Sequence, residues 1–361
     1  MKSQRITIAR ESRGLTQKEL ALATGISQSQ ISKFEQDTKE MTDFDLEKIS
    51  KALEYPISFF NKKIDTHTVH LDFRKGKLPT DKSQRKIMAI ANRTRDEIKN
   101  LLKEVDKESI IIPENIFSRK PVEAAKQLRN FWKIPKGPIH NLMEEVEEKS
   151  IILMPMKFSE QDKFTACALE LSYSNPLIIY NSTHPMDRIR FSIAHELGHI
   201  FLHHHGDQDV DLSVPYEFNQ KVKEEQANEF ASEFLMPEEE IAKDIKELNI
   251  EKLQQLKYKW KVSMAALLER ARRLTIINEL KYINFRKEFS YRKWLLEEPG
   301  KLPSEEPFLL KEIIEAYQED LGFTKKEIAE RIGLLEKEFV SIYLGKMQLS
   351  VLQFKKTNKD Q

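Results

Sequence analysis

The histidines of this chain constrain its fold more than any other feature of the sequence. Five of the nine histidines fall within residues 191–205, which read FSIAHELGHIFLHHH. Around them the sequence HPMDRIRFSIAHELGHIFLHH has apolar residues at helical spacing, and Pro185 suits a first helical turn. The apolar positions are Ile189, Ile193, Leu197 and Ile200. The sequence therefore predicts one helix that buries an apolar stripe and carries most of the histidines.

Two of these histidines have the spacing of a zinc site. His195 and His199 are four residues apart, so both imidazoles leave the same face of a helix and can share one Zn²⁺ ion. Glu196 is rotated by about 100° from His195, close to that ion without being directed at it. A carboxylate in this position can take a proton from an attacking water. We predict His195 and His199 as metal ligands and Glu196 as the general base.

The histidines that follow are poor third ligands. His205 lies ten residues after His195, but the pattern that brings such a histidine back to the metal needs Gly where this chain has Leu202. His203 is on the correct face but two turns on, about 12 Å along the axis. We expect His203, His204 and His205 to form a polar helix end or a pocket wall.

A carboxylate downstream is the better candidate for the third ligand. VKEEQANEFASEFLMP predicts a second helix that ends at Pro237. Glu224 and Asn228 are four residues apart on one face of it, so the carboxylate can complete the site and the amide can hold a ligand imidazole. Glu225 is the rival, with Glu229 one turn on. The apolar stripe is Ala227, Phe230, Ala231 and Phe234.

The first sixty residues have the pattern of a helix-turn-helix. Thr16 can cap a helix whose apolar face is Leu20 and Ala23, with Glu19 completing a capping box. Gly25 suits the tight turn, and Ser27 then caps a second helix. That second helix enters the major groove in proteins of this kind. The predicted contacts to double-stranded DNA are Gln17, Gln28, Ser29, Ser32 and Lys33.

A weaker copy of this pattern occurs near the end of the chain. A shift of 308 residues aligns Thr16 with Thr324 and Gly25 with Gly333. Glu327, Ala329 and Phe339 also fall on equivalent positions. Glu336, at the start of the would-be recognition helix, would be repelled by phosphates. We therefore predict a second unit with a packing or dimerisation role, with DNA reading as the alternative.

The remaining sequence bears on partners and compartment. Net charge is only +1, yet residues 62–103 contain twelve Lys and Arg against five acidic residues. This segment begins as a polar connector and becomes an amphipathic basic helix, which we interpret as a solvated strut, with added phosphate contact as the alternative. The single Cys167 fits a reducing compartment, and neither a signal peptide nor a long apolar run is present. We expect a soluble, cytoplasmic protein with no membrane contact.

Two parts of the chain resemble known families. Residues 4–60, through DLEKISKALEYPISFF, resemble the XRE (Cro/C1-type) helix-turn-helix regulators. Residues 120–240, with RFSIAHELGHIFLHH and EEQANEFASEFLMP, resemble the ImmA/IrrE metallopeptidases. That resemblance implies a zincin-like domain with His195, His199 and Glu224 at the ligand positions and Glu196 as general base. It also implies cleavage of a repressor of the same DNA-binding class. The residue that stabilises the oxyanion is left unassigned.

These observations predict a mostly α fold with a small β-sheet, that is, an α+β protein. Short apolar runs in SIILMPM, FTACALEL and PLIIYN suit the sheet. We expect a five-helix DNA-binding domain at 1–62, a basic helical linker at 63–110, a zincin-like domain at 111–270 and a helical domain at 271–361. The predicted function is a DNA-binding regulator, expected to be a homodimer of prophage or stress type, that cleaves a protein partner. The alternatives are a transcription factor with a sensing domain and an antitoxin-like repressor.

Overall fold

The computed structural model describes residues 2–62, 72–73, 80–104, 118, 120–160, 162–170, 176–203, 216–295 and 297–345. The chain forms two compact units, and each is assembled from segments that are far apart in sequence. The first unit comprises residues 1–109, 152–183 and 308–361, and the second comprises residues 110–151 and 184–307. The domain boundaries expected after residues 62, 110 and 270 divide the chain into continuous segments, and they stay a prediction.

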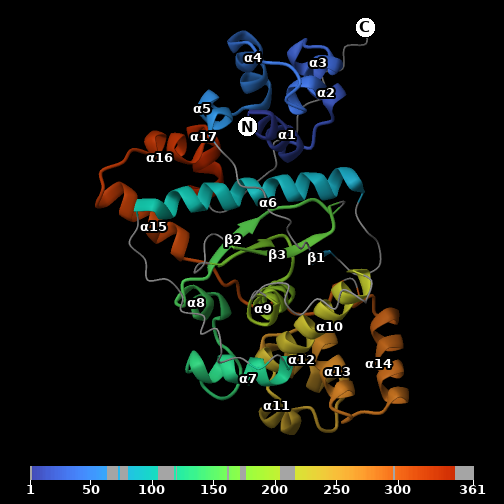
Figure 1. The fold of residues 1–361 in the computed structure, drawn as a ribbon. Coiled ribbons are helices and arrows are strands. Elements are labelled where there is room, and N and C mark those ends of the chain that lie inside the picture. The colour runs from blue at the N-terminus through green and yellow to red at the C-terminus, as the bar shows by residue number, and fades with distance from the viewer. Residues whose placement is uncertain are drawn as a thin grey trace. The chain divides into compact units, whose positions relative to one another are not determined.

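The first unit combines a helical bundle, a long helix, a sheet and the C-terminal helices (Figure 1). Its N-terminal helices are α1 (Lys2–Ser12), α2 (Gln17–Thr24), α3 (Gln28–Glu35), α4 (Asp43–Leu53), α5 (Ile57–Asn61) and α6 (Asp81–Leu101), followed by the short 3₁₀ helix η1 (Leu102–Glu104). Its strands are β1 (Asp72–Phe73), β2 (Ile152–Met156), β3 (Phe164–Glu170) and β4 (Pro176–Asn181). Its C-terminal helices are α15 (Leu309–Glu319), α16 (Lys325–Ile332), α17 (Glu336–Phe339) and the π-helix η3 (Val340–Leu344).

Helices α2 and α3 form the turn that the sequence predicts. Thr16 and Glu19 make both halves of a capping box at the start of α2. Gly25 ends α2 with a φ of 69°, a left-handed conformation that glycine adopts at no steric cost. The expected apolar face is only half correct, because Ala23 is exposed while Leu20 is buried. Thr24 takes the second inward place, and its hydroxyl donates to the backbone carbonyl of Leu20.

The three predicted strands form a sheet together with β1. The strand order is β1-β3-β4-β2, with β2 parallel to β4 and β3 antiparallel to β4 and β1. Cys167 lies opposite Ile179, and Ile152 lies opposite Leu177. All side chains of β2 and β4 are buried. The sheet is therefore part of the core of this unit, and the apolar runs in the sequence predicted its three main strands.

Helix α6 is a central element of the first unit. It packs against α1 of the bundle and against β3 of the sheet, so it lies between the two (Figure 1). Its apolar residues, including Ile87, Ile90 and Ile98, are buried. The interpretation of this helix as a solvated strut is therefore wrong. Its apolar stripe is wide enough to be covered from two sides, which an amphipathic pattern alone does not reveal.

The C-terminal repeat has the local geometry of the first. Thr324 and Glu327 form a capping box at the start of α16, and Gly333 ends the helix with a φ of 85°. Phe339, the counterpart of Ile31, is fully buried. After four residues, however, α17 becomes a π-helix, whereas α3 continues for eight residues. The predicted second unit is present, and its recognition-helix equivalent is shortened.

A buried ionic cluster ties this C-terminal unit to the N-terminal bundle. Glu338 of α17 accepts from Arg13 at 2.6 Å and from Arg93 of α6 at 3.0 Å. Arg93 also pairs with Glu97 at 2.9 Å. Burial raises the pKa of Glu97 to about 7, although the charge of Arg93 opposes that rise. Because Glu338 pairs with two arginines and keeps only 10% of its side chain exposed, this part of α17 packs against the N-terminal bundle and α6. The packing or dimerisation role of the unit stays a prediction.

The second unit is a set of helices around the histidine helix α9. Its helices are α7 (Pro121–Phe131), α8 (Leu142–Glu147), α9 (Met186–His203), α10 (Tyr216–Leu235), α11 (Glu238–Asp244), α12 (Ile250–Trp260), α13 (Met264–Arg273) and α14 (Glu279–Tyr291). Helices α9 and α10 confirm the two helices predicted from sequence. The whole chain is thus mostly α with a small sheet, as expected. Within the described residues, none of the helices has the length and apolar character needed to span a membrane.

Candidate metal centre and nucleic-acid interface

Buried ion pairs hold the first turn of α9 in place. Asp187 pairs with Lys257 of α12 at 2.6 Å, and Lys257 also pairs with Glu298 at 3.0 Å. One turn on, the fully buried Arg190 pairs with Glu305 and donates to the backbone carbonyl of Lys261 at 2.9 Å. Breaking a buried pair by removing one partner costs about 3–5 kcal/mol. These contacts therefore fix the position of α9 independently of any metal ion.

Helix α10 crosses α9 at a glycine. A Cβ atom placed on Gly198 would lie 3.0 Å from the Cα and 3.2 Å from the carbonyl oxygen of Ala227. Neither atom is on a flexible side chain, so a larger residue at position 198 would push the two helices apart. Ala227 is itself fully buried. The small residue within HELGH thus lets α10 approach closely enough to bring its carboxylates to the histidines.

Three predicted residues meet at this crossing. His195 Nε2 and His199 Nε2 are 3.0 Å apart. Glu224 places Oε2 3.3 Å from His195 Nε2 and Oε1 3.1 Å from His199 Nε2. Among the described residues, His195, His199 and Glu224 are the group of potential metal ligands that the structure brings together. Two imidazole nitrogens and one carboxylate oxygen thus face a common centre.

The geometry of this centre fits a zinc ion. Ligand atoms about 2.0–2.1 Å from a tetrahedral ion are about 3.3 Å from one another, close to the separations seen here. Two histidines and one glutamate are also a donor set that zinc takes in catalytic sites, with the fourth position left open. The residues present therefore fit the metal that the sequence predicts.

Burial and charge at the centre are uneven. His195 and Glu196 are buried, with 3% and 2% of their surface exposed. Glu224 is only half-buried. Burial by itself would raise the pKa of Glu224, but hydrogen bonds from His195 and His199 outweigh it and hold that pKa well below its usual range. Glu224 is therefore ionised, as a metal ligand must be.

The other predicted acidic and amide groups are placed differently. Glu225 points to solvent, with 70% of its side chain exposed, and lies 4.0 Å from Lys221. Asn228 donates its amide nitrogen to the backbone carbonyl of Glu224 at 2.7 Å, one turn back along α10. That bond braces the backbone of Glu224. The predicted hydrogen bond from a ligand imidazole to the amide oxygen of Asn228 stays a prediction.

His203 has a part in the centre that the sequence reasoning missed. The amide oxygen of Gln226 can only accept, so His203 donates to it through Nε2 at 2.9 Å. A neutral His203 then offers Nδ1 as an acceptor to Nδ1 of His199, 3.3 Å away. With a metal ion bound, this arrangement would keep the His199 proton on Nδ1 and leave the lone pair of Nε2 for the ion. The spacing of four residues after His199 was the available signal. His204 and His205 lie outside the described residues.

The exposed side of α3 holds most of the predicted DNA contacts. Gln28, Ser29 and Lys33 are exposed, and Ser32 is half-buried. Gln17, at the start of α2, is half-buried and donates to Glu35 at 2.9 Å. Polar side chains on the outer face of a second helix are what major-groove reading requires. The structure therefore leaves this face of α3 available to a partner.

Comparison with known families agrees with this geometry. Residues 6–60 match the helix-turn-helix family, and residues 146–272 match the IrrE N-terminal-like domain, Peptidase_M78. The second match includes strands β2–β4 and helices α9–α13. No curated protein matches the chain. The protein therefore joins an XRE-type helix-turn-helix DNA-binding domain to a peptidase-family domain of the IrrE N-terminal-like type.

Proposed function

We propose that this protein is a transcriptional regulator whose IrrE-like domain is a zinc-dependent endopeptidase that cleaves a regulatory protein, in particular a repressor. The observation that carries the proposal is the meeting of His195, His199 and Glu224 beside the buried carboxylate of Glu196. When bound by these three residues, Zn²⁺ would supply a Lewis acid that polarises the scissile carbonyl. A regulator of this kind acts on DNA in the cytoplasm.

Glu196 has the position of a general base. It follows His195 directly on α9, so its side chain leaves the helix beside the ligand face rather than on it. From there its carboxylate takes the proton of the attacking water and passes it to the leaving amine. A domain that only senses a ligand would need the three metal ligands but has no use for this carboxylate. Its presence favours the enzyme over the sensor.

The helix-turn-helix domain would bring the peptidase domain to regulatory proteins at an operator. The helix-turn-helix family match and the exposed polar face of α3 support binding to an operator in double-stranded DNA. Proteins of this class bind two half-sites as dimers, and we propose that this chain does the same as a homodimer. Cleavage of a repressor at or near the operator then changes transcription.

The proposed function predicts a metal-dependent cut in a partner protein. The protein is co-expressed with a candidate repressor of the helix-turn-helix class, and both chains are followed by intact mass. We expect a discrete fragment pair that disappears when purified protein is treated with a zinc chelator and returns when Zn²⁺ is added back. An intact partner under all conditions, with a transcriptional reporter that still responds to signal, would instead identify the domain as a sensor.

The DNA-reading face makes a second prediction. An operator is selected from random duplexes with the full-length protein, and Gln28→Ala or Ser29→Ala is expected to weaken its binding by about 1–3 kcal/mol each. Lys33→Ala should weaken all sequences alike and reduce the slope of log K against log[salt] by about 1. Lys51→Ala on the exposed side of α4 is the matched charge control. If these variants keep the specificity and Ser341→Ala, on the exposed side of η3, abolishes it instead, the C-terminal unit is the reader.

A further inference from the structure

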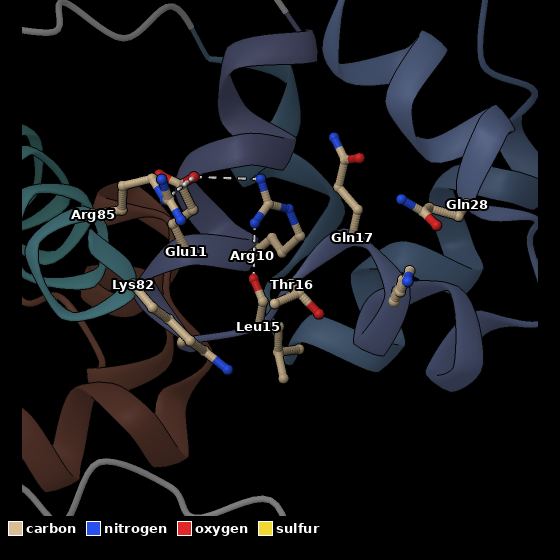
Figure 2. Close-up of a pocket in the computed structure, with 10 residues that line it drawn as sticks. Arg10, Glu11, Leu15, Thr16, Gln17, Gln28, Lys82 and Arg85 are labelled. Atoms are coloured by element: carbon tan, nitrogen blue, oxygen red, sulfur yellow. Dashed lines mark hydrogen bonds and ion pairs between the residues drawn. The ribbon is translucent and has the colours of Figure 1, made fainter. Parts of the chain in front are cut away.

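A cavity lies beside α3, the second helix of the helix-turn-helix. Part of the wall of this cavity comes from outside the helix-turn-helix. It has a volume of about 440 Å³ and lies where the end of α1 meets the starts of α2 and α3 (Figure 2). Gln17 and Gln28, both predicted DNA contacts, line it. Lys82 and Arg85 of α6 form the wall opposite (Figure 2). The cavity thus joins the expected DNA-reading face to the first turns of α6.

The charged groups around this cavity are mostly cationic. Arg10, Lys18, Lys82 and Arg85 line it together with a single carboxylate, that of Glu11. Arg10 is held in place, since it donates to Glu35 at 2.6 Å and to the Leu15 carbonyl at 2.7 Å. The other three cations have exposed side chains. The wall therefore attracts an anionic ligand.

Four basic residues of α6 fall into two groups with different roles. Lys86 pairs with the buried Asp162 at 2.9 Å, and the buried Arg93 belongs to the ionic cluster with Glu338. These two cations are therefore already paired with carboxylates inside the protein. Lys82 and Arg85 keep 50% and 61% of their side chains exposed. Their only described ion pairs are with Glu19 at 3.2 Å and Glu11 at 3.8 Å, and exposed pairs of this kind contribute about 0–1 kcal/mol.

We propose that Lys82 and Arg85 bind the phosphate backbone of the DNA that α3 reads, so that α6 is part of the nucleic-acid interface. The inference rests on the proposed DNA binding and extends it beyond the helix-turn-helix. Phosphate contacts from Lys and Arg position a protein on the duplex and release counterions. The weak pairs with Glu19 and Glu11 are exchanged for phosphates on binding. Because α6 also packs on the sheet, this contact links DNA binding to the core of the first unit.

The test compares two double variants of the full-length chain. Lys82→Ala/Arg85→Ala removes both proposed contacts. Lys99→Ala/Lys103→Ala removes the same charge from the last turn of α6 and from η1, about 25 Å along the helix axis. The probe is a fluorescent 30-base-pair duplex of random sequence, titrated over a range of salt concentrations. For two lost phosphate contacts, the slope of log K against log[salt] should fall in magnitude by about 1.8, which is about 30-fold in affinity at 0.15 M salt. The control should keep the slope of the wild type.

Further variants separate the inference from the proposed function. Lys82→Arg/Arg85→Lys keeps both charges and should retain the slope of the wild type. If Lys33→Ala weakens binding while Lys82→Ala/Arg85→Ala does not differ from the control, α6 is not at the DNA and the inference fails alone. If the wild type binds no duplex at all, the proposed DNA binding fails and the inference fails with it.

Discussion

Glu196→Gln is expected to reduce cleavage of the partner protein by about 10²–10⁴-fold, the usual contribution of a general base. The amide has nearly the size of the carboxylate but cannot carry the proton from water to the leaving amine. Metal binding should persist, because Glu196 is not among the three groups that meet at the centre. Operator affinity should also be unchanged, since the predicted reading residues are in another unit of the chain. Intact-mass measurement of the co-expressed partner gives the rate.

A matched control for this variant is Glu225→Gln. It removes a carboxylate next to the predicted ligand Glu224, but from the solvent-exposed side of α10. Cleavage by this control should equal that of the wild type. If Glu196→Gln cleaves as fast as the wild type, the proton is carried by another group. If neither the wild type nor Glu196→Gln cleaves the partner while a reporter responds equally with both, the domain is a sensor.

His195→Ala and His199→Ala are each expected to reduce bound zinc from about one ion per chain to almost none. Each removes one of the three donors, and a pair of remaining ligands cannot hold zinc at micromolar free concentrations. The measurement is metal content by mass spectrometry after dialysis, with the shift in melting temperature on adding Zn²⁺ as a second readout. Full zinc content in both variants would rule out the proposed site.

Two further histidines sharpen this test. His203→Ala should leave the ligands intact but weaken zinc binding by about 10–100-fold, because His199 loses the acceptor for its Nδ1 proton. His140, which is exposed and is not a member of the described ligand group, is the control, and His140→Ala should bind zinc as the wild type does. Equal affinity in His203→Ala and His140→Ala would show that the chain from His199 to Gln226 does not orient the ligand.

Local chemistry made much of this protein readable from its sequence. Spacing along one helix is enough to place His195 and His199 on the same face, because the α-helix repeats every 3.6 residues. Helix capping is similarly local, so Thr16 and Thr324 predicted the starts of α2 and α16. Short apolar runs predicted three strands of the sheet for the same reason. The fold class and the motif residues follow from interactions that span only a few positions.

Features that depend on distant segments were not accessible in this way. The amphipathic pattern of α6 indicated one buried face, but which elements cover it depends on how the bundle and the sheet pack around the helix. The second half of the ionic cluster, Glu338, is more than three hundred residues from its partner Arg13. Ala23 faces solvent because the core is filled by other residues. Packing partners are chosen by three-dimensional complementarity, and the sequence order does not encode it directly.

The sequence by itself therefore determined the ligand types, the capping residues and the helix that carries HELGH. Tertiary structure decided which acidic residue joins the histidines, since Glu224 and Glu225 differ only in the side of α10 from which they project. That choice depends on the close crossing of α9 and α10, where a Cβ atom on Gly198 would lie only 3.0 Å from the Cα of Ala227. It also decided the role of His203, which becomes a partner of His199 only when Gln226 of α10 is packed beside it. A metal centre needs donors from more than one element, so only the packing of those elements completes it.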